Sequence, residues 1–470
     1  MSMPPPSTDG PALNGQWRLG FVLAITLSAA MGGLLFGWDW VVIGGAKPFF
    51  ESYFGITDPA VSGWANSCAL IGCFFGAVLG GASADRFGRK GPLIASALLF
   101  GATSIGIALA NNFDVFVAWR IAGGVAIGLA SSLSPLYIAE IAPARIRGAL
   151  VAVNQLTIVI GVLGAQLTNW WIVRDLPAGM ETAALAASWY GTEAWRWMFA
   201  ICAVPSVVFL LGMLFAPESP RWLLTRGRRD DARKVLSRIG GDSHADAALV
   251  QVEATLDQPG EKVRLSDLLS PKVRGALLIG IVLAVFQQWC GINVIFNYAE
   301  EVFKAAGYDL SSVIANIAWT GSVNLAFTVL ALNLVDRAGR RPLMLFGAAG
   351  LAVIYTAMAV CFALGIGGLP TLLLVLAAIA CYAMSLAPVT WVVIAEIFPN
   401  RIRGAAIAVA VGALWLASFV LTYSFPLLNS TLKAHGTFGL YAVICVLGFM
   451  FIWFRMPETK GRSLEDIEND

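Results

Sequence analysis

The sequence has few charged residues. Asp, Glu, Lys and Arg make up only 13% of its 470 residues, whereas 58% are hydrophobic and the mean hydropathy is +0.75. A soluble protein of this length needs roughly 25% charged residues to cover its surface. Apolar runs of about twenty residues, each long enough to cross a hydrocarbon core, recur along nearly the whole chain. The composition therefore excludes a soluble globular protein and predicts an all-α membrane protein.

Residues that hold metals or cofactors are scarce or scattered. The two histidines fall in expected loops, and the seven cysteines are spread over separate apolar runs. Neither set has the spacing of a metal site or of a disulfide framework. The spans also contain no nucleophile with a neighbouring base. We therefore expect no enzymatic activity, no metal, no cofactor and no nucleic-acid partner.

Twelve apolar spans can be placed along the chain. They lie near residues 19–46, 60–84, 91–110, 115–139, 149–173, 195–216, 275–299, 311–335, 342–367, 370–395, 404–428 and 437–456. Lys and Arg concentrate in the loops after the second, fourth, eighth and tenth spans and in the long middle connection. By the positive-inside rule these segments and both termini are cytoplasmic, in the cell (inner) membrane.

The two halves of the sequence repeat. The recurring pairs are 80–90 with 331–342, 138–148 with 394–404, and 217–219 with 457–459. Three motifs in the same order indicate two pseudo-symmetric six-helix bundles, with a substrate site between them near mid-membrane. The predicted organisation is a disordered tail at 1–16, an N-terminal bundle at 17–216, a cytoplasmic helical connection at 217–272, a C-terminal bundle at 273–456 and a cytoplasmic tail at 457–470.

Several motifs, taken together, resemble those of one known family. They are FGWDWVVIGG, the paired D-R-x-G-R loops, the paired A-E-x-x-P-x-x-x-R-G segments, PESPRWL and QQWCGIN. The combination covers nearly the full chain and is similar to the sugar porter family of the major facilitator superfamily, above all to bacterial proton-coupled symporters of pentoses and hexoses. The resemblance implies monosaccharide transport by alternating access, with the sugar, protons and the lipid bilayer as partners of a monomer.

Two buried charges of opposite sign are predicted to pair. Asp39 in the first span lies about 12 Å from the outer end of its helix, and Arg120 in the fourth span lies about 9 Å deep. Each charge alone costs ~2.5–3.5 kcal/mol inside a membrane. Burial favours the neutral acid and the guanidinium favours the carboxylate, so the pair suits proton coupling. The family resemblance implies the same role for the acid, and a purely structural ion pair is the alternative.

Isolated amides and two tryptophans form the candidate sugar site. The set is Gln155, Gln287, Gln288, Asn293, Asn297, Asn324, Trp391 and Trp415. Amides match the donors and acceptors of a polyol in both directions, and Gly291 suggests either a helix break or a tight helix contact within the seventh span. Each amide alone is equally well explained as a contact between helices, but the set spans both halves. The resemblance implies direct sugar contacts for all of them except Asn297, Asn324 and Trp415, the last two lining the cavity.

Charged motifs at the predicted cytoplasmic helix ends are candidates for a gate. The two matching sets are Asp85, Arg89, Glu140 and Arg147, and Asp336, Arg340, Glu396 and Arg403. Opposite charges at adjoining helix ends would latch the two bundles together, as a bias on a two-state equilibrium. Solvated charges that only set topology are the alternative. Glu140 and Glu396 are the strongest candidates because each recurs in register at the inner end of a span.

Three positions depart from the common family pattern and leave the identity of the sugar open. Leu414 stands where several members have an amide, Asn297 where many have tyrosine, and Trp38 where tyrosine is common. Two other functions remain open as well. One is a facilitative uniporter with a structural Asp39–Arg120 pair, and the other is a sugar sensor without net flux.

Overall fold

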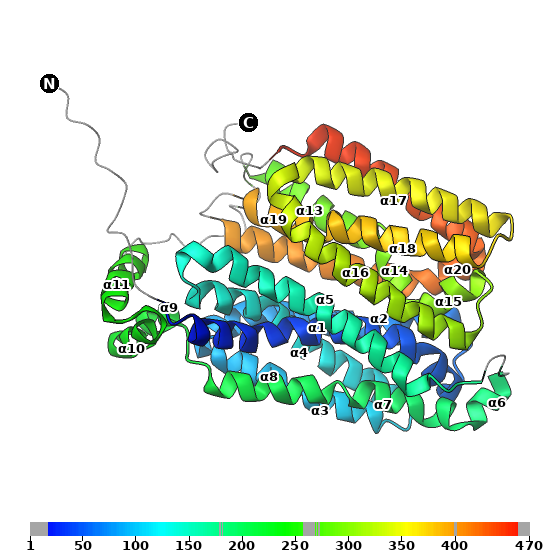
Figure 1. Ribbon diagram of the computed structural model, residues 1–470, viewed down its shortest axis with the longest axis horizontal. Helices are drawn as coiled ribbons and strands as arrows, with labels where there is room; N and C mark the ends of the chain where they lie inside the picture. The colour runs from blue at the N-terminus through cyan, green and yellow to red at the C-terminus, as the bar shows by residue number, and fades with distance from the viewer. Residues whose placement is uncertain are drawn as a thin grey trace.

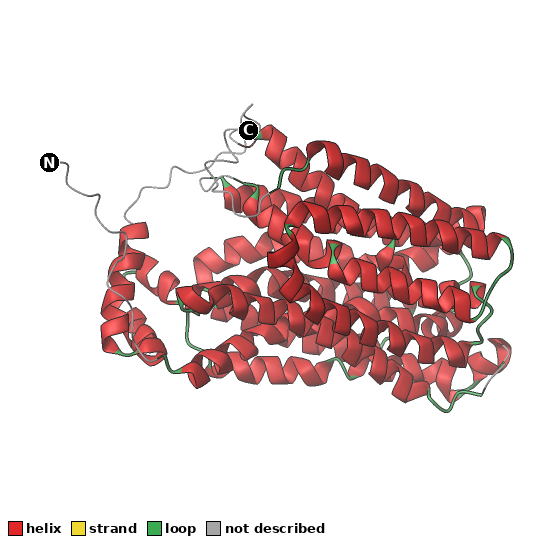
Figure 2. Ribbon diagram, turned by 45° about the horizontal axis from the view of Figure 1, so that its top comes forward, coloured by secondary structure: helices red, strands yellow, loops and turns green. Residues whose placement is uncertain are grey.

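The structure, a computed structural model, describes residues 17–177, 180, 182–256, 268, 270, 273–398 and 402–458. Every regular element in these residues is helical (Figure 2). The predicted tail at 1–16, much of the connection after residue 256 and most of the tail at 457–470 lie outside the described residues.

The helices of the first half build one bundle. They are α1 (Leu19–Phe54), α2 (Pro59–Phe87), α3 (Lys90–Ala108), α4 (Phe113–Ile141), η1 (Ala144–Ile146), α5 (Arg147–Val173), α6 (Thr182–Ala187), η2 (Tyr190–Ala194), α7 (Trp195–Ala200) and α8 (Ala203–Phe215). The connection contributes α9 (Pro220–Thr225), α10 (Arg229–Gly240) and α11 (Asp242–Leu256).

The second half builds the other bundle. Its helices are α13 (Arg274–Trp289), α14 (Ile292–Asn297), α15 (Ala299–Ala305), α16 (Leu310–Ala338), α17 (Arg340–Ala363), α18 (Leu369–Met384), α19 (Leu386–Glu396) and α20 (Arg403–Arg455). In Figure 1 the blue-to-green and yellow-to-red halves lie side by side with their long helices roughly aligned. Between the bundles, α2 packs on α20 and α5 packs on α16.

The described residues contain eleven helices long and apolar enough to cross a membrane. The last of these, α20, has 53 residues and a non-helical backbone at Lys433, with φ 57° and ψ 176°. A straight helix of that length would measure about 80 Å, well over twice a hydrocarbon core of about 30 Å. The break divides α20 into two crossings, drawn in orange and red in Figure 1, so the twelve predicted spans are accounted for.

The connection helices lie against one end of the molecule (Figure 1). The predicted apolar face of α10 is buried, with Ala232 and Ile239 at 0% and 1% exposure. The backbone N–H of Arg18 donates to the Ile239 carbonyl at 2.9 Å and so holds the start of α1 at this end. We call it the basic end, and the opposite end, where α1 finishes and α15 lies, the far end. His244 lies within α11 and not in a loop as expected, although still outside the spans.

Glycines let α1 approach α5 closely. A Cβ at Gly37 of α1 would overlap the backbone carbonyl of Ile158, and one at Gly161 of α5 would overlap the carbonyl of Leu34. Lipid supplies no hydrophobic drive for helices to associate, so membrane bundles depend on such close backbone packing. This packing sets the position of α1, and with it the depth of Asp39.

We expect Gly37→Ala to lower the thermal stability of the protein in detergent by several degrees, because the added methyl group must push α1 away from α5. The matched control is Gly20→Ala on the same helix, where nothing lies within 4 Å of the added carbon. Its unfolding temperature should stay the same or rise slightly, since alanine has the higher helix propensity. Equal losses in both variants would contradict the packing argument.

Candidate functional site

The structure brings Asp39 and Arg120 together. Arg120 Nη1 of α4 donates to Asp39 Oδ1 of α1 at 2.9 Å. The two residues are 3% and 8% exposed, and the Arg120 guanidinium also lies 5.4 Å from the ring centre of Phe199. Neither charge is solvated by bulk water, so each depends on the other for its stability.

A cavity adjoins this pair. Its volume is about 20 Å³, room for about one water molecule, and Asn297 is the lining residue that the second bundle contributes. The lining residues are Phe36, Asp39, Trp40, Ile43, Asn66, Ala69, Leu70, Cys73, Arg120, Ile127 and Asn297. The side-chain oxygens of Asn66 and Asn297 are buried, and neither accepts a hydrogen bond from the described residues. The cavity therefore offers unused acceptors beside a buried ion pair.

An aromatic group from both bundles borders the same cavity. Trp415 of α20 packs against two lining residues of α1, with its ring centre 5.7 Å from that of Phe36 and 6.1 Å from that of Trp40. Its indole N–H is buried and donates to no described residue. Trp415 thus combines an apolar face with an unused donor, which is the combination that a sugar ring needs.

The predicted break in the seventh span is present. Gly291 has φ 89°, a left-handed conformation that favours glycine, and it separates α13 from α14. The break places Asn293 beside Gln288, whose Oε1 accepts from Asn293 Nδ2 at 2.5 Å. Gln288 Nε2 in turn donates to Gln287 Oε1 at 3.1 Å. Three of the predicted amides therefore form one chain of hydrogen bonds in this conformation.

The other candidates are placed singly. Gln155 is half-buried on α5, Asn324 is buried on α16, and Trp391 of α19 is 39% exposed. Among the described contacts, none joins these three to the amide chain. Trp391 does lie one turn after Ala387, whose carbonyl accepts from Gln287 Nε2 at 3.4 Å.

Comparisons with known proteins agree with this geometry. Residues 25–470 match the family described as "Sugar (and other) transporter". The chain belongs to the sugar transporter family. It is 39% identical to the D-xylose-proton symporter of Escherichia coli (strain K12), over 97% of both chains, and 33% identical to the glucose facilitated diffusion protein of Zymomonas mobilis, over 97% of this chain and 98% of that protein. The partially occluded inward-open structure of the xylose transporter XylE from E. coli matches with a TM-score of 0.83 at 36% identity, covering 95% of this chain and all of that one.

These similarities place the chain in the major facilitator superfamily and confirm the predicted fold class. The protein is a multi-pass membrane transporter and not an enzyme. Its similarity to both a symporter and a facilitator leaves the coupling mode to be argued from the chain's own residues.

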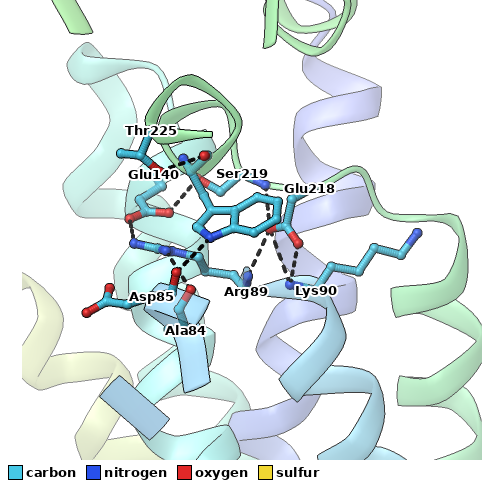
Figure 3. Close-up of polar contacts among 9 residues, drawn as sticks. Ala84, Asp85, Arg89, Lys90, Glu140, Glu218, Ser219 and Thr225 are labelled. Atoms are coloured by element: carbon cyan, nitrogen blue, oxygen red, sulfur yellow. Dashed lines mark hydrogen bonds and ion pairs between the residues drawn. The ribbon is translucent and has the colours of Figure 1, made fainter. Parts of the chain in front are cut away.

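At the basic end, charged residues from the first half of this sugar transporter form one network of polar contacts (Figure 3). Arg89 Nη2 lies 2.7 Å from Glu140 Oε1, and Glu140 Oε2 accepts from the Ser219 hydroxyl at 2.5 Å. Glu218 accepts from the backbone N–H groups of Arg89 and Lys90 at 2.9 and 3.3 Å, where its charge complements the start of α3.

The second half repeats this arrangement. Arg340 Nη2 lies 3.1 Å from Glu396 Oε1, and Glu458 accepts from the backbone N–H groups of Arg340 and Arg341 at 3.0 and 3.1 Å. The repeated PES and PET segments, none of whose residues the sequence made a site candidate, therefore supply an acid to a helix start in each bundle.

These ion pairs differ from the expected latch. The Arg89–Glu140 pair joins the start of α3 to the end of α4, within the first bundle. The Arg340–Glu396 pair joins the start of α17 to the end of α19, within the second bundle. Asp85 and Arg147 are exposed, while Arg403 Nε donates to the Phe398 carbonyl at 3.3 Å. The side chain of Asp336 lies outside the described residues.

Lys47 was missed as a functional candidate. The sequence placed the end of the first span at residue 46, but α1 continues to Phe54 and Lys47 is 4% exposed. A hint was available, because Glu51 one turn later is an i,i+4 partner, but the other partners of Lys47 come from the second half of the chain.

We expect Arg120→Met to destabilise the protein by about 3–5 kcal/mol, because it leaves Asp39 charged, buried and unpaired. The double variant Asp39→Asn/Arg120→Met should recover at least half of that loss in thermal unfolding. The control is Arg229→Met, which breaks an exposed pair with Glu253 and should leave the unfolding temperature nearly unchanged. Additive losses from Asp39→Asn and Arg120→Met would show that the two charges are not coupled.

Proposed function

We propose that the chain is a proton-driven monosaccharide symporter that works by alternating access. The observation that carries the proposal is the buried Asp39–Arg120 pair beside a cavity lined from both bundles. A xylose-proton symporter at 39% identity over nearly the full length supports both the sugar and the proton as substrates. The two bundles of one chain supply every candidate group, so a monomer suffices.

In this proposal the sugar binds between the bundles near the middle of the membrane. Gln287, Gln288 and Asn293 exchange their mutual hydrogen bonds for bonds to sugar hydroxyls, at little net cost because each bond lost is replaced. Trp415 supplies a ring face and an indole N–H. Gln155, Asn324 and Trp391 complete the site from α5, α16 and α19 when the bundles move.

Asp39 carries the proton. In the present conformation Arg120 neutralises the carboxylate at 2.9 Å. Protonation removes the negative charge, which frees the guanidinium to find another acceptor and loosens α1 from α4. A buried cation without a partner is costly, so the proton and the helix arrangement are linked.

We further propose that the basic end is cytoplasmic, together with both termini. The described Lys- and Arg-rich loop between α2 and α3 lies at that end, where Arg226 Nη2 donates to the Arg86 carbonyl at 2.6 Å, as the positive-inside rule requires. The Arg89–Glu140 and Arg340–Glu396 pairs then brace the cytoplasmic ends within each bundle. Glu140 and Glu396 act as gate residues: when the cytoplasmic ends of the bundles approach, each glutamate can also pair with an arginine of the other bundle.

A facilitative uniporter is the second candidate, because a glucose facilitator is 33% identical over nearly the same length. In that case the Asp39–Arg120 pair only fixes the packing of α1 on α4. The two functions differ in whether a proton gradient drives accumulation.

We expect proteoliposomes with an inward proton gradient to accumulate a monosaccharide above its external concentration, in a panel that includes xylose, arabinose and glucose. Asp39→Asn should abolish accumulation and retain sugar exchange, since the neutral amide resembles the protonated acid. Asp114→Asn, an exposed acid at the start of the Arg120 helix, is the matched control and should accumulate normally. Equilibration without accumulation in the wild type would favour the uniporter, and loss of both activities in Asp39→Asn would favour a structural pair.

For the sugar site we expect Gln288→Ala to raise the KM for the transported sugar about tenfold, because a buried amide that bonds a hydroxyl contributes roughly 1–3 kcal/mol. Gln251→Ala, which removes an exposed amide on α11, should leave KM unchanged. An unchanged KM for Gln288→Ala would mean that the amide chain only holds the broken helix together.

A further inference from the structure

A group of buried charges joins the two bundles at the far end. Lys47 Nζ of α1 lies 2.8 Å from Glu51 of its own helix and 2.5 Å from Glu301 of α15. Glu300 of α15 lies 3.9 Å from the same nitrogen and 2.5 Å from Lys304 Nζ. We call these five residues the far-end cluster. Because α1 belongs to one bundle and α15 to the other, the Lys47–Glu301 contact exists only while the far ends are together.

The cluster contains more negative than positive charge. Its three carboxylates, those of Glu51, Glu300 and Glu301, face two ammonium groups, those of Lys47 and Lys304. The side chain of Lys47 is only 5% exposed, so water screens these charges weakly. With every group ionised, closing the far end would bury one uncompensated negative charge.

Glu301 is the carboxylate least satisfied by its surroundings. Glu51 accepts from Lys47 and, at 2.5 Å, from the hydroxyl of Ser62 on α2. Glu300 accepts from Lys304. The Oε2 atom of Glu301 is buried and accepts from none of the described residues. The side chain is nevertheless 24% exposed, so a proton can reach it from the far-end solvent.

Among the described residues, the other side chains in contact with the cluster, those of Tyr298 and Ser62, carry no charge to offset this imbalance. Tyr298, whose ring lies 5.8 Å from Lys47 Nζ, donates its hydroxyl to the Thr422 carbonyl of α20. α2 contributes only the hydroxyl of Ser62. Burial raises the pKa of Glu301 to about 7, with Lys47 opposing the rise and Glu300 adding to it.

We propose that the far-end cluster is a second proton-binding site, which takes up one proton at Glu301 from the external side when the two bundles close there. The proton cancels the excess negative charge that closure would otherwise bury. When the bundles separate, Glu301 returns to water and to the ordinary acidity of a glutamate, and the proton leaves. The proposal rests on alternating access and on the external position of the far end, but not on the role of Asp39.

The direction of the pH effect follows from this difference. The pKa of Glu301 is higher in the closed state than in water, so the closed state binds more protons. The closed far end is therefore favoured at acid pH, and the preference is lost as pH rises through about 7. One proton changes the ratio of closed to open molecules by at most about tenfold per pH unit.

The test measures the distance between nitroxide labels at Thr57→Cys and Leu432→Cys, two exposed positions at the far ends of the two bundles, in lipid nanodiscs between about pH 5 and pH 8. Cys361→Ser removes the one half-buried cysteine, since the other six are buried. All measurements use an Asp39→Asn background, so that titration of Asp39 contributes nothing. We expect the short-distance population to fall as pH rises.

Glu301→Gln should abolish this pH response and keep the far end closed, because the amide imitates the protonated acid. Glu193→Gln, which removes a half-buried acid on η2 whose side chain is 46% exposed, is the matched control and should keep the response. Glu300→Gln removes the excess negative charge and should shift the response to lower pH, which keeps the proposal testable should Glu301→Gln fold poorly.

A response that is absent in the Asp39→Asn background, that survives Glu301→Gln, or that is not shifted by Glu300→Gln would overturn the proposal. The outcome is separate from that of the transport assay. A pH-dependent far end in a protein that never accumulates sugar would leave the cluster in place and remove the symport function.

Discussion

The structure depends first on the ion pair between Asp39 and Arg120. Two charges at this depth are tolerated only together, since an unpaired one costs several kcal/mol. The 2.9 Å contact therefore requires α1 and α4 to keep one register along the membrane normal. Close glycine packing of α1 on α5, at Gly37 and Gly161, supplies that register without any polar contact of its own. The position of α1 and the charge of Asp39 therefore depend on each other.

α1 contacts the other bundle at two further levels along its length. Around the cavity, Phe36 and Trp40 meet Trp415 of α20, and beyond it a Cβ at Gly44 would overlap the backbone carbonyl of Phe296 in α14. The same helix that holds the acid therefore also touches the broken seventh span, whose amides form the candidate sugar site. Any shift of α1 that follows a change at Asp39 reaches that site through direct packing, without a long chain of intermediates.

The sequence was informative wherever one physical constraint dominated. Span positions follow from the length of apolar runs, the pairing of Asp39 with Arg120 follows from the cost of burying each, and the break at Gly291 follows from a glycine between amides. It was weaker for charges at helix ends. Such a charged side chain can be solvated, can pair within its own bundle or can pair with the other bundle. Only the tertiary packing decides which of these three occurs. Lys47 looked like a solvated flank but is buried. The Arg89–Glu140 and Arg340–Glu396 pairs join helices of one bundle, and a latch between the bundles stays a prediction.

The two proposed proton sites, Asp39 on α1 and Glu301 on α15, need not move together. Pro48 follows Lys47 directly and has no N–H to bond the carbonyl of Gly44, so the last turns of α1 are less firmly tied to the part that holds Asp39. The far-end cluster can then open and close on its own contacts while the central pair stays in register. If both proposals hold, the carrier separates two tasks: Asp39 binds the proton that crosses with the sugar, and Glu301 responds to the pH of the external solution. That division lets external pH adjust how often the far end opens without changing the number of protons that cross with each sugar.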